Sequence, residues 1–242
     1  MRLFGKSDIG RRRSSNQDDY AFGRLGSSAV WAAVCDGMGG ANGGNVASAM
    51  AVREISRHIE SDYREGCKPN SIKTLLQSAV YTANAEIYEE ARKNEALAGM
   101  GTTVVAVVVA DKLACIAHVG DSRAYLIHED TICQITRDHS VVQEMVEAGQ
   151  ITQEQARAHP NKNVITRALG IVPEIAIDYS EVTLQRGDAL ILCTDGLSNQ
   201  MEADEIKNIV KAGVEDACAQ LVTQANARGG PDNITVVLLS DR

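Results

Sequence analysis

The chain has 242 residues and a net charge of -8. That length fits one large domain or two small ones, and a chain of this size buries about 70 to 75% of its unfolded surface. The acidic balance argues against a nucleic-acid binder, which carries a basic excess. The longest apolar run, 104–110, is far shorter than the roughly 20 residues that span a bilayer. The first residues contain no apolar leader segment, so we expect a cytoplasmic protein without membrane or nucleic-acid partners.

The six cysteines form no C-x-x-C pair, and most of them lie in apolar runs. This pattern predicts reduced core residues rather than disulfides or a zinc site. No cysteine is followed six positions later by arginine, which excludes the C-x5-R signature of thiol-dependent phosphatases. Proline is scarce, with 4 residues, and no Gly/Ser-rich stretch divides the chain. We therefore expect residues 1–242 to form a single domain.

Alternating or wholly apolar runs predict strands, and apolar residues at helical spacing predict helices. The predicted strands are 2–9, 20–25, 29–35, 102–110, 113–119, 122–127, 131–136, 175–184, 188–193 and 234–240, and the main helices are 46–59, 72–87, 203–212 and 214–228. Short turns join the strands between 102 and 136, which favours an antiparallel meander. Helix pairs beside antiparallel strands indicate an α+β fold in layers. The irregular stretch 139–170, with two short helical patterns, is typical of a functional insert.

Aspartates recur beside glycine at the edges of apolar runs. Asp36 ends one strand and is followed by Gly37, Met38, Gly39 and Gly40, while Asp121, Asp195 and Asp232 occupy similar positions later in the chain. Each aspartate taken alone could be an ordinary turn or cap residue. Together with Asp18 near the start of the chain, they indicate one converging cluster.

A basic triplet, Arg11-Arg12-Arg13, precedes Asp18 in a polar loop. Such a triplet is either a solvated face or a source of one arginine that binds an anion beside a metal. Carboxylates with few histidines nearby form an oxygen-ligand site, which suits magnesium or manganese better than zinc. Hard cations held by carboxylates favour phosphoryl chemistry, in which two metals activate a water and clamp the phosphate.

These motifs resemble the metal-dependent serine/threonine protein phosphatases of the PPM (type-2C) family, in its compact bacterial form. The resemblance runs from Gly10 to Val236 in order. Its motifs are Arg13-x-x-Asn16-x-Asp18, Asp36-Gly37-Met38-Gly39-Gly40, Gly101-Thr102-Thr103, Gly120-Asp121-Ser122-Arg123, Ile165-Thr166-Arg167-Ala168-Leu169-Gly170, Thr194-Asp195-Gly196-Leu197 and Asp232-Asn233-Ile234-Thr235. It implies a four-layer α-β-β-α sandwich: two antiparallel sheets between two pairs of antiparallel helices, with the metals at one end.

The resemblance also implies roles for individual residues. Asp36 would bridge two manganese or magnesium ions, with Asp195 and Asp232 completing the first site and the carbonyl of Gly37 serving the second. Asp18 would hold metal-bound water, Arg13 would bind the substrate phosphate, and Asp121 with Asp195 would hold a weaker third ion. The catalytic residues are then Arg13 and Asp36. Residues 139–170 match the mobile flap of the family.

One position departs from the family pattern. Animal relatives carry histidine, the proposed general acid, where this chain has Met38. Methionine cannot donate a proton, so the acid would be a metal-bound water or another group, with His118 and His139 as weak candidates. The implied activity is hydrolysis of phosphoserine and phosphothreonine in proteins by a metal-bridging water, in a monomer that opposes a serine/threonine kinase. Three alternatives remain: a phosphatase for a single regulator, a phosphatase for small phosphate esters, and a catalytically silent binding module.

Overall fold

The computed structural model describes residues 1–241, except for the side chains of residues 41 and 42. It contains two antiparallel sheets packed face to face. The first sheet has the order β1 (Arg2–Asp8), β11 (Ile234–Ser240), β10 (Ala189–Cys193), β7 (Arg123–His128), β8 (Thr131–Gln134). The second has the order β2 (Asp18–Leu25), β3 (Ala29–Met38), β5 (Val104–Ala110), β6 (Leu113–Val119), β9 (Asp178–Thr183), and β4 (Gly101–Thr102) pairs with the end of β3.

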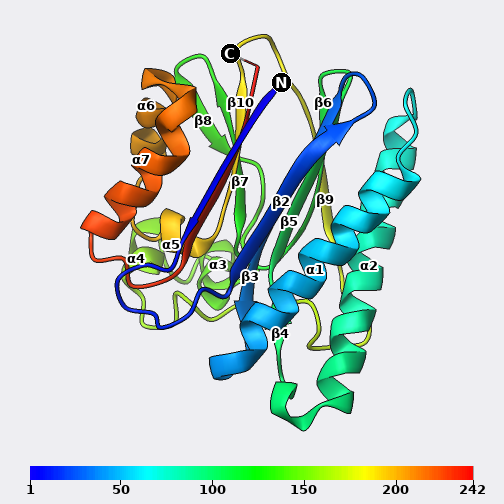
Figure 1. The fold of residues 1–242 in the computed structure, drawn as a ribbon. Helices are drawn as coiled ribbons and strands as arrows, with labels where there is room; N and C mark the ends of the chain where they lie inside the picture. The colour runs from blue at the N-terminus through cyan, green and yellow to red at the C-terminus, as the bar shows by residue number, and fades with distance from the viewer. Residues whose placement is uncertain (242) are drawn as a thin grey trace.

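Helices cover the outer face of each sheet (Figure 1). The long helices α1 (Gly40–Asp62) and α2 (Pro69–Lys93), followed by a 3-10 turn at Glu95–Leu97, pack on the second sheet. The helices α6 (Ala203–Ala212) and α7 (Val214–Ala227) pack on the first. The predicted four-layer α-β-β-α sandwich is therefore confirmed. None of the helices among the described residues is long and apolar enough to cross a membrane.

The central strands alternate between two apolar layers. In β3, Trp31, Ala33 and Cys35 pack against the helices, while Val30 and Val34 face the other sheet. Because successive side chains of a strand point to opposite faces, a strand buried on both faces is apolar at every position. The strand β5, which lies within the predicted strand 102–110, is buried at every residue.

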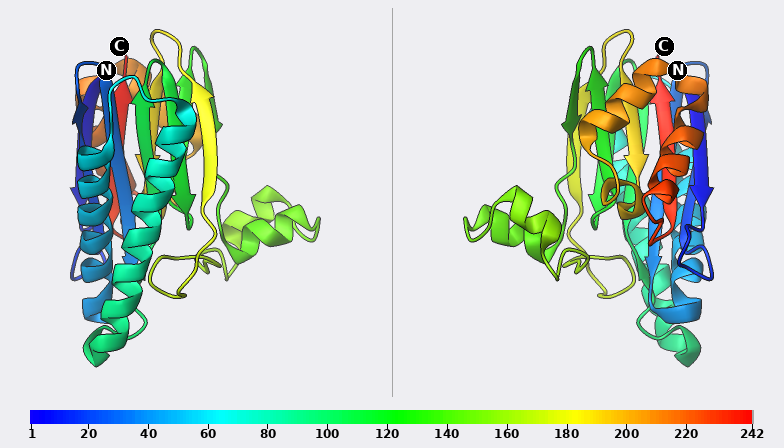
Figure 2. Two further views of the ribbon diagram at one scale, coloured as in Figure 1. Left: turned by 90° about the vertical axis from the view of Figure 1, so that its right-hand side faces the viewer. Right: turned by 90° about the vertical axis from the view of Figure 1, so that its left-hand side faces the viewer.

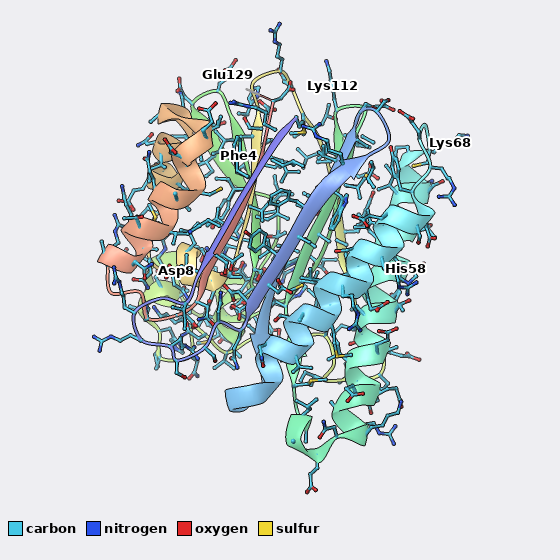
Figure 3. The ribbon with its side chains drawn as sticks, viewed as in Figure 1. Phe4, Asp8, His58, Lys68, Lys112 and Glu129 are labelled. Atoms are coloured by element: carbon cyan, nitrogen blue, oxygen red, sulfur yellow. The ribbon has the colours of Figure 1, made fainter. Side chains whose placement is uncertain are left out.

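The chain reverses tightly at one end of the sandwich. The β5–β6 turn has positive φ at Asp111 and Lys112, and the β7–β8 turn has positive φ at Glu129. Lys112 and Glu129 lie at the upper end of the molecule in Figure 3, far from Asp8 and the loops of the opposite end. Both turns are those predicted from the sequence, and the opposite end of the sandwich carries the longer loops.

The predicted meander between 102 and 136 is wrong. The strands β5 and β6 pair in one sheet, whereas β7 and β8 pair in the other, so the chain crosses between the sheets at residues 120–122. Gly120 makes this crossing with φ 110°, and a Cβ there would lie 2.6 Å from the Thr103 side chain. Only glycine meets both conditions at low cost. The short connection resembles a hairpin in sequence, but it changes sheets.

Two further elements differ from the expectation. The predicted strand 175–184 is shorter and begins at Asp178 as β9, and a short helix, α5 (Asp195–Ser198), follows β10 without having been predicted. The stretch 139–170 contains α3 (Val141–Glu147) and α4 (Gln153–Ala158) at the predicted places. We call residues 139–170 the α3–α4 segment, and Figure 2 shows that its two helices stand away from the sandwich at the end opposite the tight turns.

Candidate active site

The predicted site residues come from five separate parts of the chain and meet at one end of the sandwich. Asp36 lies near the end of β3, Asp121 in the β6–β7 crossing, and Asp195 at the start of α5 after β10. Asp232 precedes β11, and Asp18 begins β2. Because neighbouring strands are antiparallel, the C-terminal ends of some strands and the N-terminal ends of others lie at the same end of the sandwich.

A cavity of about 630 Å³ opens at this end of the sandwich. Its lining includes the predicted carboxylates Asp36, Asp121, Asp195 and Asp232 together with Arg13. Gly37 and the three residues that follow it, including Met38, form another part of the wall. The structure therefore brings together every predicted site residue except Asp18, which lies behind this wall opposite Asp36 in the β2–β3 register.

Main-chain and threonine contacts hold Asp36 in place. Its backbone N–H donates to Thr103 Oγ1 at 3.0 Å, and its carbonyl accepts from Thr103 N at 2.9 Å and from Thr102 Oγ1 at 2.9 Å. The next residue, Gly37, packs so closely on α1 that a Cβ would lie 2.0 Å from the Gly44 carbonyl oxygen. Glycine at both positions lets the start of α1 approach the end of β3.

Asp18 is held by two hydroxyl groups. Its Oδ2 accepts hydrogen bonds from Thr194 Oγ1 at 2.9 Å and from Thr235 Oγ1 at 2.7 Å. Thr194 immediately precedes Asp195, and Thr235 lies three residues after Asp232. The two threonines thus connect Asp18 to the strands that present two of the other carboxylates, which is an arrangement typical of residues that orient metal ligands from behind.

Burial and mutual repulsion raise the pKa values of these carboxyl groups. Burial, opposed by the two threonine hydrogen bonds, raises the pKa of Asp18 to about 7. Burial and the charge of Asp232 raise the pKa of Asp195 to about 6. The pKa values of Asp36 and Asp121 lie well above their usual range, because both groups are buried and face other carboxylates. Like charges this close disfavour ionisation, whereas a cation bound among them would reverse the effect.

Arg13 reaches the cluster from the β1–β2 loop. Its Nη2 lies 2.6 Å from Asp232 Oδ2, and about half of its side chain remains exposed. The pKa of Arg13 is raised, first by this hydrogen bond and then by the charges of Asp232, Asp36 and Asp195, although burial opposes the shift. Of the two interpretations of the basic triplet, the geometry favours an arginine that serves the site over a merely solvated face.

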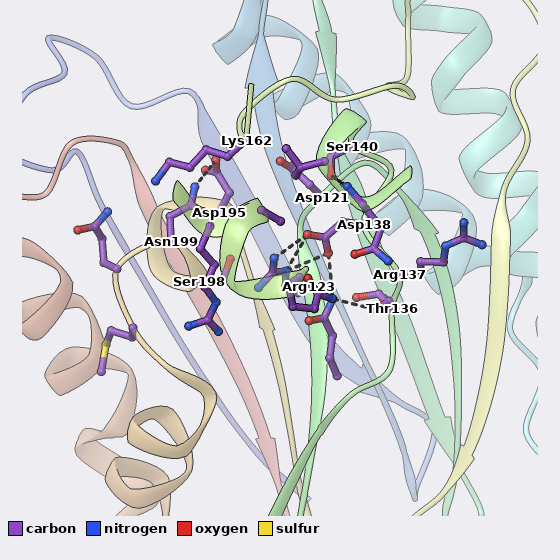
Figure 4. A pocket seen from close by; sticks show the side chains of 18 of the residues that line it. Asp121, Arg123, Thr136, Arg137, Asp138, Ser140, Lys162, Asp195, Ser198 and Asn199 are labelled. Atoms are coloured by element: carbon purple, nitrogen blue, oxygen red, sulfur yellow. Dashed lines mark hydrogen bonds and ion pairs between the residues drawn. The ribbon is translucent and has the colours of Figure 1, made fainter. Parts of the chain in front are cut away.

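A second cavity of about 570 Å³ adjoins the first, beneath the α3–α4 segment. Asp121 and Asp195 line both cavities. Figure 4 shows Asp195 beside Asn199, whose Nδ2 donates to Asp195 Oδ2 at 3.0 Å. Lys162, from the α3–α4 segment, lies on the same side of the cavity. The α3–α4 segment therefore forms one wall of a space that continues to the carboxylate cluster.

The donor set fits a hard divalent cation. All the charged groups of the cluster are carboxylates, and Asp195 Oδ1 is buried without a hydrogen-bond partner among the described residues. Oxygen donors of this kind suit magnesium or manganese. In the part of the chain that the structure describes, no three His, Cys, Asp or Glu side chains are close enough together to coordinate one metal ion. The carboxylates line one cavity, but their oxygen atoms do not converge on a single coordination site.

The two histidines considered as general acids are not among the residues that line the carboxylate cavity. His118 is buried among the strands, and burial lowers its pKa to about 3. Burial also lowers the pKa of His139, whose ring lies against that of His118 with centroids 4.8 Å apart. Both rings are therefore neutral near pH 7 and closed off from a substrate. The structure argues against either histidine as the proton donor that Met38 cannot be.

Several supporting residues were missed in the sequence. Thr194 and Thr235 hold Asp18, Thr103 holds Asp36, and Asn199 contacts Asp195. All three threonines lie inside the motifs quoted above, but only Thr194 stands beside a candidate ligand in the sequence, which is a usable signal. Asn199 carried no such signal, because it reaches Asp195 only through the unpredicted turn of α5.

Comparison with known proteins shows the family of this chain. The family model described as protein phosphatase 2C matches residues 5–237. The serine/threonine phosphatase stp of Listeria innocua is 39% identical over 236 residues, covering 97% of this chain and 93% of that protein. Among solved structures, serine/threonine phosphatase Stp1 from Staphylococcus aureus gives a TM-score of 0.93 at 34% identity, covering 98% of this chain and 94% of that one.

A further solved structure is the catalytic domain of the serine/threonine protein phosphatase PstP in complex with two manganese ions. It gives a TM-score of 0.83 at 32% identity, covering 98% of this chain and 96% of that one. The chain belongs to the protein phosphatase 2C family. This membership confirms the predicted family and the predicted class of enzyme, a serine/threonine protein phosphatase.

The burial of His118 predicts a loss of stability in acid. The unfolded chain binds a proton at this residue below about pH 6.5, whereas the folded chain does so only near pH 3. The contribution of His118 to the free energy of unfolding should therefore fall as the pH drops through this window, by up to about 1.4 kcal/mol per pH unit. The carboxyl groups with raised pKa values contribute in the opposite direction, so the His118 contribution has to be isolated with a variant.

Urea unfolding of the chelated wild type and of His118→Leu, at several pH values between 7 and 4, measures this slope. Between pH 7 and pH 4 the free energy of unfolding of the wild type should fall relative to that of the variant, because only the wild type takes up a proton at residue 118 when it unfolds. The carboxylates contribute alike to both proteins, so their contribution cancels in the difference. Equal slopes would show that His118 takes up its proton equally in both states.

Proposed function

We propose that this protein hydrolyses phosphoserine and phosphothreonine in other proteins, in a metal-dependent reaction at the carboxylate cavity. The observation that carries the proposal is the convergence of Asp36, Asp121, Asp195 and Asp232 with Arg13 on one cavity. Acidic ligands beside an exposed arginine suit a phosphate monoester, which needs both cations and a planar hydrogen-bond donor. Membership of the protein phosphatase 2C family supports the same reaction.

We assign the metal-binding roles to oxygen donors of the cavity. Asp36 would bridge two manganese or magnesium ions, Asp195 and Asp232 would complete one site, and the carbonyl of Gly37 would serve the other. Asp121 lines the cavity next to Asp195 and would help to hold a weaker third ion. The PstP structure with two manganese ions supports the pair of ions. When bound, such ions lower the pKa of water and neutralise the charge of the phosphate.

The residues of the chain have distinct tasks in this reaction. Arg13 would hold two phosphate oxygens with its planar guanidinium group. Asp18, behind the cluster, would accept hydrogen bonds from water in the site and keep that water oriented. Met38 contributes an apolar part of the wall and no proton. The glycines after Asp36 let the main chain approach the substrate closely.

The alternatives from the sequence are less well supported. A catalytically silent binding module would not need all four cavity carboxylates, yet all four are present and face the cavity. A phosphatase for one regulator or for small esters would use the same metal site, but the similar proteins are named as serine/threonine phosphatases. Phosphorylated proteins, the products of a serine/threonine kinase, are therefore the proposed substrates.

The remaining expectations are part of the same proposal. Residues 1–242 form a single phosphatase domain, and the α3–α4 segment, residues 139–170, is the flap beside the substrate. We propose a monomer that acts in kinase signalling in the cytoplasm. The cytoplasmic location is supported by the cysteines, of which Cys35, Cys115, Cys193 and Cys218 are buried free thiols, as expected of a protein from a reducing compartment.

Chelation tests the metal dependence. The protein stripped with a chelator should lose its activity on a phosphothreonine peptide, and added manganese should restore it. Asp36→Asn should lower kcat by about 100-fold or more even at saturating manganese, because one carboxylate serves both ions. A stripped protein that hydrolysed the peptide at the full rate would contradict the mechanism. A panel of small phosphate esters, measured beside the peptide, tests the substrate class.

Arg13→Ala should raise KM for the phosphopeptide by about 10-fold or more, since a charged hydrogen bond to phosphate contributes about 1.5 to 3 kcal/mol. The affinity for manganese should not fall, because the variant removes a cation that pairs with Asp232. Arg13→Lys is the matched control, which keeps the charge and loses the planar donor. Weaker manganese binding with an unchanged KM would assign Arg13 a structural part instead.

A further inference from the structure

His139 and Gly120 share two hydrogen bonds. The backbone N–H of Gly120 donates to His139 Nδ1 at 3.0 Å, and the backbone N–H of His139 donates to the Gly120 carbonyl at 2.8 Å. Gly120 is the crossing residue with φ 110°. Both of its polar main-chain groups are therefore committed to a single neighbour, which fixes the peptide planes on either side of Gly120.

The residue that follows Gly120 is Asp121, and its other flank is also held. Ser122 Oγ lies 2.7 Å from Thr103 Oγ1, and Thr103 in turn bonds to the backbone of Asp36. Asp121 is thus held between His139 on one side and the Asp36 strand on the other. The Asp121 side chain is buried, and a small rotation of its backbone would move the carboxylate relative to Asp36 and Asp195.

The orientation of the His139 ring is fixed independently. Since Nδ1 accepts from a backbone N–H, the neutral ring carries its proton on Nε2. Nε2 lies 3.2 Å from Asp178 Oδ2, to which it donates, and also 3.2 Å from Arg167 Nη1, which donates instead to Asp178 Oδ1 at 2.9 Å. The side chain of His139 is 4% exposed, so it does not touch a substrate. Hydrogen bonds from residues behind a metal site commonly fix the orientation of the ligands.

We infer that His139 is a positioning residue for Asp121, acting through the Gly120 peptide. The inference rests on the proposed role of Asp121 in holding the most weakly bound ion. His139 also closes the base of the α3–α4 segment, since its carbonyl accepts from Thr166 N at 2.8 Å. That second contact uses only main-chain atoms, so a change of the side chain separates the two roles.

Two polar variants of similar size test the inference. In His139→Asn the amide oxygen can replace Nδ1 as acceptor for Gly120, whereas in His139→Gln the longer side chain places its amide near Nε2. Manganese titrated calorimetrically into the chelated proteins gives the affinity for the most weakly bound ion. His139→Gln should weaken that affinity by about 10-fold or more, with a parallel fall in kcat on a phosphopeptide. His139→Asn should stay near the wild type in both measurements.

Asp121→Asn and the double variant with His139→Gln complete the experiment. If His139 acts through Asp121, the double variant should bind the weak ion no worse than Asp121→Asn alone, because the two effects are not additive. Additive losses, or equal losses in His139→Gln and His139→Asn, would overturn the positioning role. Thermal unfolding of each variant detects a general loss of stability, and a change in melting temperature alone, with the affinity intact, would also overturn it.

The outcome for Asp121→Asn separates the two claims. If that variant weakens the last ion while His139→Gln does not, the role of Asp121 stands and the positioning role of His139 fails. If Asp121→Asn leaves both ion binding and kcat unchanged, the role of Asp121 fails, and the role of His139 fails with it.

Discussion

The mutual repulsion of buried carboxylates at one end of the sandwich is the constraint on which this structure depends. Asp18, Asp36, Asp121 and Asp195 are all held at pKa values above the usual range by burial and by one another. A protein gains no stability from such a cluster. The cluster is retained, in our account, because cations bound there compensate the repulsion and carry the chemistry.

The rest of the fold keeps these groups in place despite their repulsion. The strands β3, β5, β10 and β11 are almost wholly apolar and buried on both faces, so they form a rigid base for the loops at their ends. Local hydrogen bonds then fix each carboxylate: two threonine hydroxyls hold Asp18, and Thr103 holds the backbone of Asp36. The apolar layers supply the stability, and the polar end supplies the site.

The residue pattern alone predicts an α+β fold in layers and a cluster of carboxylates, because both depend on local patterns. The two sheets between helix pairs and the roles of single residues follow from the family resemblance instead. Runs such as Val104–Ala110 are buried on both faces and are recognised from composition alone. Glycine permits close main-chain approach, and the structure shows such an approach at Gly37, against Gly44, and at Gly196, where a Cβ would lie 1.9 Å from the Asn233 carbonyl oxygen. The four cavity carboxylates follow from their positions at strand edges.

What the sequence does not predict depends on contacts between distant segments. The crossing at Gly120 has the length of a hairpin turn, and only the strand pairing, with β6 beside β5 and β7 beside β8 and β10, shows that the chain changes sheets there. The bonds from Thr194 and Thr235 to Asp18 need the relative register of two sheets. The same holds for the pairing of His139 with Gly120, because 19 positions separate the two residues.

The account is tested most directly by the stability of Asp195→Asn with and without manganese. At about pH 8 the ionised Asp195 repels its neighbours, since its pKa is about 6. The variant should therefore melt at a higher temperature than the wild type when both are chelated, and it should gain less from saturating manganese, because binding to the folded state alone raises stability. A chelated variant that melts lower than the wild type, with an undiminished gain from manganese, would contradict the account.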